Sequence, residues 1–204
     1  LVCATTGKKG WFWYIPLHNN IVSVGVVAAY DYLFLNRPER DHEEIYFTEV
    51  SRCPGVKDRI APGKRVAPFR AAKEYSYRSR RAAGDGWVLA GDAFGFLDPL
   101  YSSGVLLALT SGSMAADAVV EGLAKGDTSA AQLGKWEETF GRGMERMRRL
   151  VCAYYDGFSF GRFVRRYPQH KGDLTDLLIG DLFKDELDDV LAKVDAMRAE
   201  ADVA

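Results

Sequence analysis

The feature that most constrains the fold is residues 86–105, where an apolar strand, a glycine-rich loop and an apolar helix follow one another. Trp87–Ala90 is short and wholly apolar, as strands buried on both faces of a parallel sheet are. Gly91–Ser103 is rich in glycine, proline and serine, which favours a loop. Gly104–Leu123 carries apolar residues on nearly every face of its first turns, which predicts a buried helix.

The loop in this run has the chemistry of a ligand site. Asp92 places a carboxylate at the end of the strand, where it can accept hydrogen bonds from ligand hydroxyls. Gly91, Gly95 and Gly104 lack a Cβ, so the backbone can approach a ligand closely there. The predicted helix points unpaired N–H groups and a partial positive charge back into the loop. These properties together predict a cofactor site, although strand, turn and helix also occur in any α/β crossover.

The rest of the chain predicts a mixed α/β architecture. Two aromatic and β-branched runs, 11–17 and 21–29, predict a hairpin. A helix is expected within 38–51 and one or two strands within 65–81. Further helices are expected over 130–155, capped by Thr128 or Ser129, and from Asp173 or Thr175 to about 199. We predict three segments: a substrate-domain β-layer (1–83), the end of a cofactor-binding domain (84–127) and a helical subdomain (128–204).

Composition excludes several functional classes. The 204 residues are 48% hydrophobic, enough for a core, and 27 basic residues balance 28 acidic ones, which argues against nucleic acid or an anionic membrane as partner. No run of roughly 18 uninterrupted apolar residues occurs. Three cysteines without a CxxC pair favour a reduced, cytoplasmic protein, and three isolated histidines predict no metal site. Because the chain begins at leucine, we expect a fragment of a longer protein.

Residues 91–105 resemble the second FAD-contacting motif of the flavin monooxygenase superfamily. Their residue pattern is most similar to that of the flavin-dependent halogenases. The matching residues are Gly91-Asp92-Ala93, Asp98-Pro99 and Ser103-Gly104-Val105. The resemblance implies that Asp92 binds the ribityl chain of FAD and that Pro99 lines the isoalloxazine ring. It also implies that Gly91, Ser103, Gly104 and Val105 contact the flavin, and that the amides of Ser103 and Gly104 face the halide.

A second motif agrees with the first. Residues 11–16, WFWYIP, match the WxWxIP signature that distinguishes flavin halogenases from ordinary monooxygenases. In this family the aromatic wall lies beside the flavin, which implies that role for Trp11 and Trp13; the residues by themselves indicate one face of a strand and a core role. The resemblance extends through Arg70 and Tyr75 and covers residues 10–125.

One departure from the family bears on the substrate. Tryptophan halogenases carry a glutamate where this chain has Tyr101, and that glutamate assists attack on indole. Tyr101, taken as part of the substrate or flavin wall, therefore argues for a phenol or pyrrole type of ring, free or tethered to a carrier protein. The resemblance implies FAD, chloride or bromide, and a flavin reductase as partners.

The most consistent interpretation is the C-terminal part of an FAD-dependent halogenase. The chain contains no GxGxxG after a strand, and the catalytic lysine of the family is expected in an N-terminal half, so no catalytic residue is assigned here. Two other enzymes share the superfamily motif, an FAD-dependent monooxygenase and a flavin reductase resembling geranylgeranyl reductases. A further alternative is a folded module that is inactive by itself.

Overall fold

The computed structural model describes residues 2–4, 10–35, 37–73 and 76–201. The chain divides into two compact units, Leu1–Glu74 and Tyr75–Ala204. Both contain helices and short antiparallel sheets, which confirms the predicted mixed α/β architecture.

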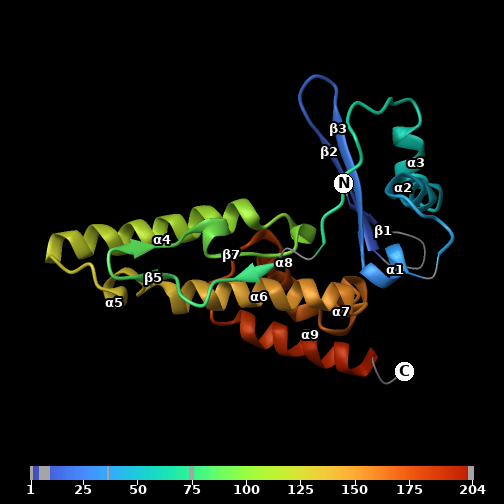
Figure 1. The fold of residues 1–204 in the computed structure, drawn as a ribbon. Coiled ribbons are helices and arrows are strands. Elements are labelled where there is room, and N and C mark those ends of the chain that lie inside the picture. The colour runs from blue at the N-terminus through green and yellow to red at the C-terminus, as the bar shows by residue number, and fades with distance from the viewer. Residues whose placement is uncertain (1, 5–9, 36, 74–75, 202–204) are drawn as a thin grey trace. The chain divides into compact units, whose positions relative to one another are not determined.

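The first unit is built on a three-stranded antiparallel sheet of β1 (Val2–Ala4), β2 (Gly10–Pro16) and β3 (Val22–Ala28), in that order (Figure 1). The predicted hairpin is confirmed, with Trp13 opposite Gly25 in the register of β2 and β3. Asn19 and Asn20 form its turn with φ of 54° and 58°. Asparagine tolerates this left-handed conformation, which the tightest hairpin turns require.

Three helices follow the sheet: α1 (Tyr30–Phe34), α2 (His42–Ser51) and α3 (Pro54–Ile60). The α2 helix lies within the predicted span 38–51 and begins where the Asp41 carboxylate accepts the backbone N–H of Glu44 at 2.8 Å. Phe12, on β2, is fully buried and packs with Val50 and Val56 of the helices. Even-numbered residues of β2 therefore face α2 and α3, and Trp11 and Trp13 lie on the opposite face.

A buried carboxylate joins α1 to α2. Glu49 is fully buried, and it accepts hydrogen bonds from the Tyr32 hydroxyl at 2.9 Å and from the guanidinium groups of Arg37 and Arg52, each at 3.1 Å. Arg37 also pairs with Glu39 at 2.9 Å. These three donors all belong to the first unit, so the cluster stabilises that unit.

The second unit holds the remaining elements. Its strands form two short antiparallel pairs, β4 (Tyr77–Arg78) with β7 (Gly95–Phe96) and β5 (Ala83–Gly84) with β6 (Trp87–Val88). Its 3-10 turns are η2 (Gly91–Ala93), η3 (Pro99–Tyr101) and η4 (Pro168–His170). Its α-helices are α4 (Gly104–Lys125), α5 (Ala130–Leu133), α6 (Glu137–Tyr155), α7 (Phe160–Arg166), α8 (Lys171–Ile179) and α9 (Leu187–Ala201).

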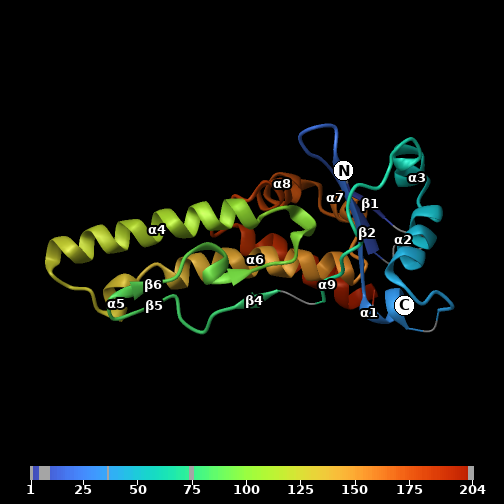
Figure 2. The same cartoon turned by 45° about the horizontal axis from the view of Figure 1, so that its top comes forward.

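Helices α6 and α9 pack side by side and contribute half of the buried residues described for the second core (Figures 1 and 2). Met147 and Leu150 on α6, and Val190 and Leu191 on α9, are almost completely buried. Arg146, which is 3% exposed, joins the two helices by a bidentate ion pair with Asp188 and by a 2.8 Å hydrogen bond to the Leu182 carbonyl.

Several predicted elements differ from those observed. Among the described residues of 65–81 only Tyr77–Arg78 form a strand, and Pro68 and the cations leave 65–73 without secondary structure. The predicted buried parallel strand at 87–90 is a two-residue strand paired antiparallel with β5, and Trp87 is 46% exposed. The predicted helix over 130–155 is interrupted at Gly134, and the last predicted helix is two helices, α8 and α9.

The α4 helix forms as predicted but is not buried all round. Leu107, Ser111, Ala115, Ala118 and Gly122 form its buried face. On the other side an apolar stripe, made of Val105, Leu109, Val120 and Leu123, is between 66% and 74% exposed. By length and composition alone α4 is the one helix of the described part able to cross a membrane, a property that core helices share, and the Asp117, Glu121 and Lys125 side chains interrupt its apolar character.

Candidate functional site: the loop before helix α4

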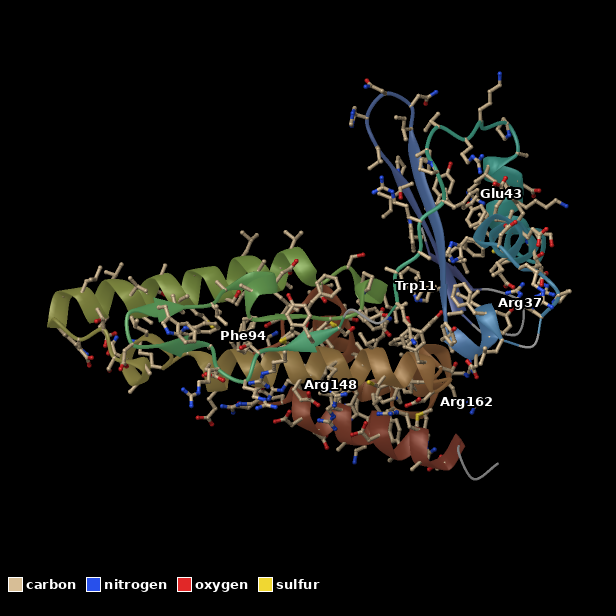
Figure 3. The ribbon with its side chains drawn as sticks, viewed as in Figure 1. Trp11, Arg37, Glu43, Phe94, Arg148 and Arg162 are labelled. Atoms are coloured by element: carbon tan, nitrogen blue, oxygen red, sulfur yellow. The ribbon has the colours of Figure 1, made fainter. Side chains whose placement is uncertain are left out.

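The loop 91–103 is held in place by two apolar side chains that point into the core. Phe94 is fully buried and lies edge-to-face against Trp136 and Phe140, with the Arg78 guanidinium 5.4 Å from its ring centre (Figure 3). Leu100 is 5% exposed. These anchors fix the backbone on either side of Gly95–Pro99, so the loop conformation is set by core packing.

Polar contacts fix the two ends of the loop. The Gly91 N–H donates to the Ser111 hydroxyl at 2.8 Å, and that hydroxyl donates to the Leu107 carbonyl one turn back on α4. Gly91 has φ of +56°, a conformation that favours glycine, and an added Cβ would lie 3.2 Å from the Ala108 Cβ. The beginning of the loop therefore lies directly against α4.

Asp98 organises the second half of the loop. One carboxylate oxygen accepts the Leu100 N–H at 2.9 Å and caps η3, and the other accepts the Tyr155 hydroxyl, also at 2.9 Å. Tyr155 is the last residue of α6, so the loop is tied to that helix. Asp98 thus has a positioning role that the sequence motif did not reveal.

The Asp92 carboxylate, unlike that of Asp98, makes no contact that positions the loop in the described part of the chain. Its side chain is exposed, and in the described part of the chain its carboxylate has no hydrogen-bond or ion-pair partner. Its backbone carbonyl accepts the Tyr77 hydroxyl, which ties β4 to η2. An unpaired carboxylate on a rigid turn can accept hydrogen bonds from a ligand.

The N-terminus of α4 is also available to a ligand. Ser103 is buried but caps no N–H group with its side chain, and Ser102 before it adopts the left-handed conformation with φ of 54°. A Cβ at Gly104 would meet nothing within 4 Å. Among the described residues no side chain caps the first N–H groups of this 22-residue helix, and Gly104 and Val105 are exposed. The helix dipole stabilises negative charge at this end.

Tyr101 has a different environment from the open residues around it. Its ring packs edge-to-face on Phe160, and its hydroxyl donates to the Leu150 carbonyl at 3.4 Å. Burial raises the pKa of the phenol well above its usual value, and the nearby Tyr154 and Asp98 raise it further. Tyr101 therefore stays protonated at neutral pH and cannot act as a base there.

The predicted site residues fall into two groups. The loop brings together Gly91, Asp92, Pro99, Tyr101, Ser103, Gly104 and Val105 in the second unit. Trp11 and Trp13 lie on β2 of the first unit, where Trp11 is 2% exposed and the Trp13 indole N–H donates to the Ser23 hydroxyl at 3.0 Å. An added Cβ at Gly25 would lie 2.0 Å from the Trp13 ring, so the indole lies against the backbone of β3 at this glycine.

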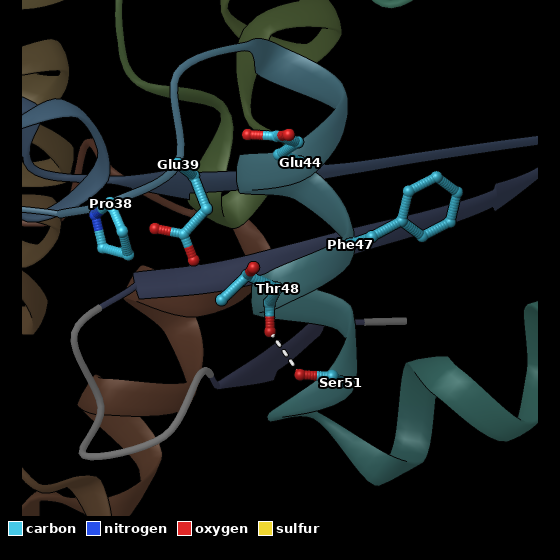
Figure 4. A pocket seen from close by; sticks show the side chains of 6 residues that line it. All are labelled: Pro38, Glu39, Glu44, Phe47, Thr48 and Ser51. Atoms are coloured by element: carbon cyan, nitrogen blue, oxygen red, sulfur yellow. Dashed lines mark hydrogen bonds between the residues drawn. The ribbon is translucent and has the colours of Figure 1, made fainter.

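Outside this loop, the described residues offer no further candidate for a ligand or metal site. A shallow depression of about 580 Å³ on α2 is lined by Pro38, Glu39, Glu44, Phe47, Thr48 and Ser51 (Figure 4). Its carboxylates are already used, since Glu39 pairs with Arg37 and Glu44 accepts the Arg40 N–H. The residues described include no cluster of three or more His, Cys, Asp or Glu side chains that could hold a metal ion.

Comparison with known proteins identifies the class. The chain is 31% identical over 185 residues to the 1H-pyrrole-2-carbonyl-[peptidyl-carrier protein] chlorinase of Pseudomonas fluorescens, covering 90% of this chain and 40% of the relative. It is 35% identical over 149 residues to the tryptophan 2-halogenase of Chondromyces crocatus, covering 72% of this chain and 28% of that protein. Both relatives are halogenating enzymes, and this is the class of protein to which the chain is similar.

A match to a family model identifies the particular family. Residues 2–159 match the family described as tryptophan halogenase, and the chain belongs to this family of flavin-dependent halogenases. The flavin-dependent brominase Bmp2 superposes with a TM-score of 0.79 at 25% identity, covering 98% of this chain and 50% of that one. The likeness thus continues beyond residue 125, where the motifs end. The chain spans between about a quarter and a half of the length of these relatives.

Proposed function

We propose that this chain is the part of a flavin-dependent halogenase that cups the flavin and the halide, and that the whole protein halogenates an electron-rich aromatic ring. The observation that carries the proposal is the segment 91–105, where Asp92 and the N-terminus of α4 lie at the two ends of one loop. Within the described residues the Asp92 carboxylate has no partner and the helix N-terminus has no side-chain cap. Family membership supports the same reaction.

The residues present fit FAD. The exposed Asp92 carboxylate would accept hydrogen bonds from the ribityl hydroxyls, and the glycine backbone at 91 and 104 leaves room for close approach. Pro99 and Val105 would lie along the ring. Bound FAD, once reduced and exposed to oxygen, supplies the oxidising equivalent that converts chloride or bromide to an electrophilic halogen.

The chain's own contribution is electrostatic. The backbone N–H groups near Ser103 and Gly104 would bind the halide, because their dipoles are unpaired and already oriented. Protonated Tyr101 would form part of the wall rather than remove a proton. Core packing of Phe94 and Leu100 holds these groups in place without rearrangement.

We infer that the ring is of the phenol or pyrrole type. Tyr101 stands where the tryptophan halogenases carry a glutamate, and one relative acts on a pyrrole carbonyl group attached to a peptidyl carrier protein. A carrier-tethered pyrrole is thus the first substrate to test, with free tryptophan as the contrasting one.

The decisive experiment uses the full-length protein with reduced FAD, supplied by a flavin reductase, and with chloride or bromide. We expect mass spectrometry to show halide-dependent addition of one halogen to the pyrrolyl carrier or to a phenol. Asp92→Ala should weaken FAD binding by at least about tenfold, since it removes charge-assisted hydrogen bonds. Oxygen insertion that is independent of halide would identify a monooxygenase instead, and alkene reduction would identify a reductase.

A further inference from the structure

A basic segment occupies residues 52–73 of the first unit. Within it lie seven cationic side chains and one acidic residue, Asp58, although the whole chain has a formal net charge of −1. Every one of the cations is exposed. They are Arg52, Lys57, Arg59, Lys64, Arg65, Arg70 and Lys73.

Most of this charge is not neutralised inside the unit. Arg52 pairs with Glu49 at 3.1 Å and Arg65 with Glu43 at 2.6 Å. Among the described residues, Lys57, Lys64 and Arg70 have no ion-pair partner. Seven like charges within 22 residues repel one another, so the segment lowers its free energy when an anionic surface binds to it.

The segment is nevertheless held in a defined position. Phe69 is half-buried, with its ring centre 5.2 Å from that of Tyr46 and 5.9 Å from that of Phe47. The Arg65 guanidinium lies 5.0 Å from the centre of the Phe69 ring, and the Lys73 ammonium lies 4.6 Å from that of Tyr30. Aromatic packing therefore fixes the backbone and leaves the cations at the surface.

The backbone of the second half of this segment lies outside the helices and strands described. From Lys64 to Lys73 it has no helix or strand and forms no backbone hydrogen bond with any described residue. Connecting segments on the surface of a rigid unit frequently carry binding residues. A rigid, exposed and cationic stretch is suited to contact a folded partner.

We propose that the basic segment is the docking surface for an anionic carrier protein that delivers the tethered substrate. The inference rests on the proposed function. A carrier presents its substrate on a phosphopantetheine arm, which is attached through an anionic phosphodiester, so cations beside the arm stabilise the complex. Nucleic acid fits less well, because Phe69 is the only aromatic residue of the segment and its ring is already covered.

The test measures binding and needs no turnover. The 204-residue chain is titrated with a pyrrolyl-loaded peptidyl carrier protein by isothermal calorimetry at several salt concentrations. The double variant Lys64→Glu, Arg70→Glu should bind at least about tenfold more weakly and with a smaller salt dependence, because two attractive interactions become repulsive. Lys64→Arg, Arg70→Lys should retain the affinity.

A matched control reverses two exposed cations of the second unit, Arg162→Glu and Lys171→Glu, with the same change in net charge. It should bind within about twofold of the unaltered chain, since net charge alone is not the cause. Circular dichroism and the melting temperature verify that each variant is folded, and Lys64→Ala, Arg70→Ala provides a milder change should charge reversal unfold the unit.

Three results would overturn the docking surface: no binding of the carrier to the unaltered chain, equal binding by the reversed variant, or tighter binding of a short single-stranded oligonucleotide. The proposed function is judged separately, by halogenation of a free pyrrole or phenol by the full-length protein. A failure of the docking surface can therefore be distinguished from a failure of the proposed function.

Discussion

Gly25 shows how one missing side chain positions another. The Trp13 indole occupies the place where a Cβ at Gly25 would be, and its N–H is held by the Ser23 hydroxyl. The aromatic face of β2 thus depends on a residue of β3 that lies outside the WxWxIP motif.

We expect Gly25→Ala to destabilise the first unit by about 1–3 kcal/mol, because the new methyl group overlaps the indole and forces it out of its rotamer. Urea unfolding gives the free energy, and near-UV circular dichroism reports the tryptophan environment. Gly112→Ala is the matched control, since a Cβ there meets nothing within 4 Å; it should stabilise α4 by about 0.5–1 kcal/mol. Equal effects of the two substitutions would refute the overlap.

Glu39 is a single residue that makes the stability of the folded chain depend on pH. The Arg37 guanidinium, followed by the Thr48 hydroxyl, lowers the pKa of this carboxyl from 4.5 to about 2. A carboxyl whose pKa is lower in the folded state contributes stability above its unfolded pKa and loses that contribution as the pH falls toward the folded pKa.

The melting temperature of Glu39→Gln should therefore lie below that of the unaltered chain at pH 7. The difference should shrink as the pH falls from 4.5 to about 2, where the unaltered carboxyl also becomes protonated. Thermal unfolding followed by circular dichroism across this range is the measurement. A difference that stayed constant with pH would show that Glu39 acts through packing and not through its charge.

At the scale of elements, Arg146 joins α6 to α9. The side chain is 3% exposed, whereas its partner Asp188 is 59% exposed and can be solvated when the arginine is removed. The Leu182 carbonyl would lose its hydrogen bond. Removing Arg146 therefore leaves no buried unpaired charge. The cost in stability comes from the lost ion pair and the lost hydrogen bond.

Replacing Arg146 with Met should lower the free energy of unfolding by about 2–3 kcal/mol, through the lost ion pair and the unsatisfied carbonyl. The control is Arg142→Met, one turn earlier on the same helix, where the side chain is 51% exposed and its two ion pairs are 4.0 Å long. That change should alter the free energy by no more than about 0.5 kcal/mol. Urea denaturation curves distinguish the two outcomes.

The exposed apolar stripe of α4 is a second property of one element. Side chains such as Leu109 and Leu123, at 70% and 66% exposed, promote association of the isolated chain. Leu109→Lys with Leu123→Lys should reduce light scattering of concentrated solutions and leave the melting temperature nearly unchanged, because neither side chain belongs to the core. A large drop in melting temperature would show that the stripe is packed.

At the scale of the whole molecule, the proposed function makes this chain only one part of a flavin site. It contributes the loop 91–105, but no GxGxxG motif occurs in its 204 residues to bind the pyrophosphate. We expect the purified chain to be colourless, with no visible flavin absorbance. Purification with stoichiometric yellow flavin would contradict this expectation and show that the loop binds the ring unaided.

The motif residues of the candidate site could be singled out from the sequence because they lie close together in it. Asp92, Pro99 and Gly104 lie within one short run whose order of strand, loop and helix is local. The groups that position the loop could not be found in the same way. Tyr77, Ser111 and Tyr155 contact the run from 15 to 57 residues away, and single polar residues at such separations leave no periodic signal.

The sequence by itself determined the mixed α/β class, the hairpin of β2 and β3, the apolar helix after the loop and the family, because short-range periodicity and ordered motifs carry that information. Only the tertiary structure decided which face of α4 is buried, where the long helices break, and that Asp92 is open while Tyr101 is enclosed. Burial depends on which distant side chains pack together, and no local pattern specifies that.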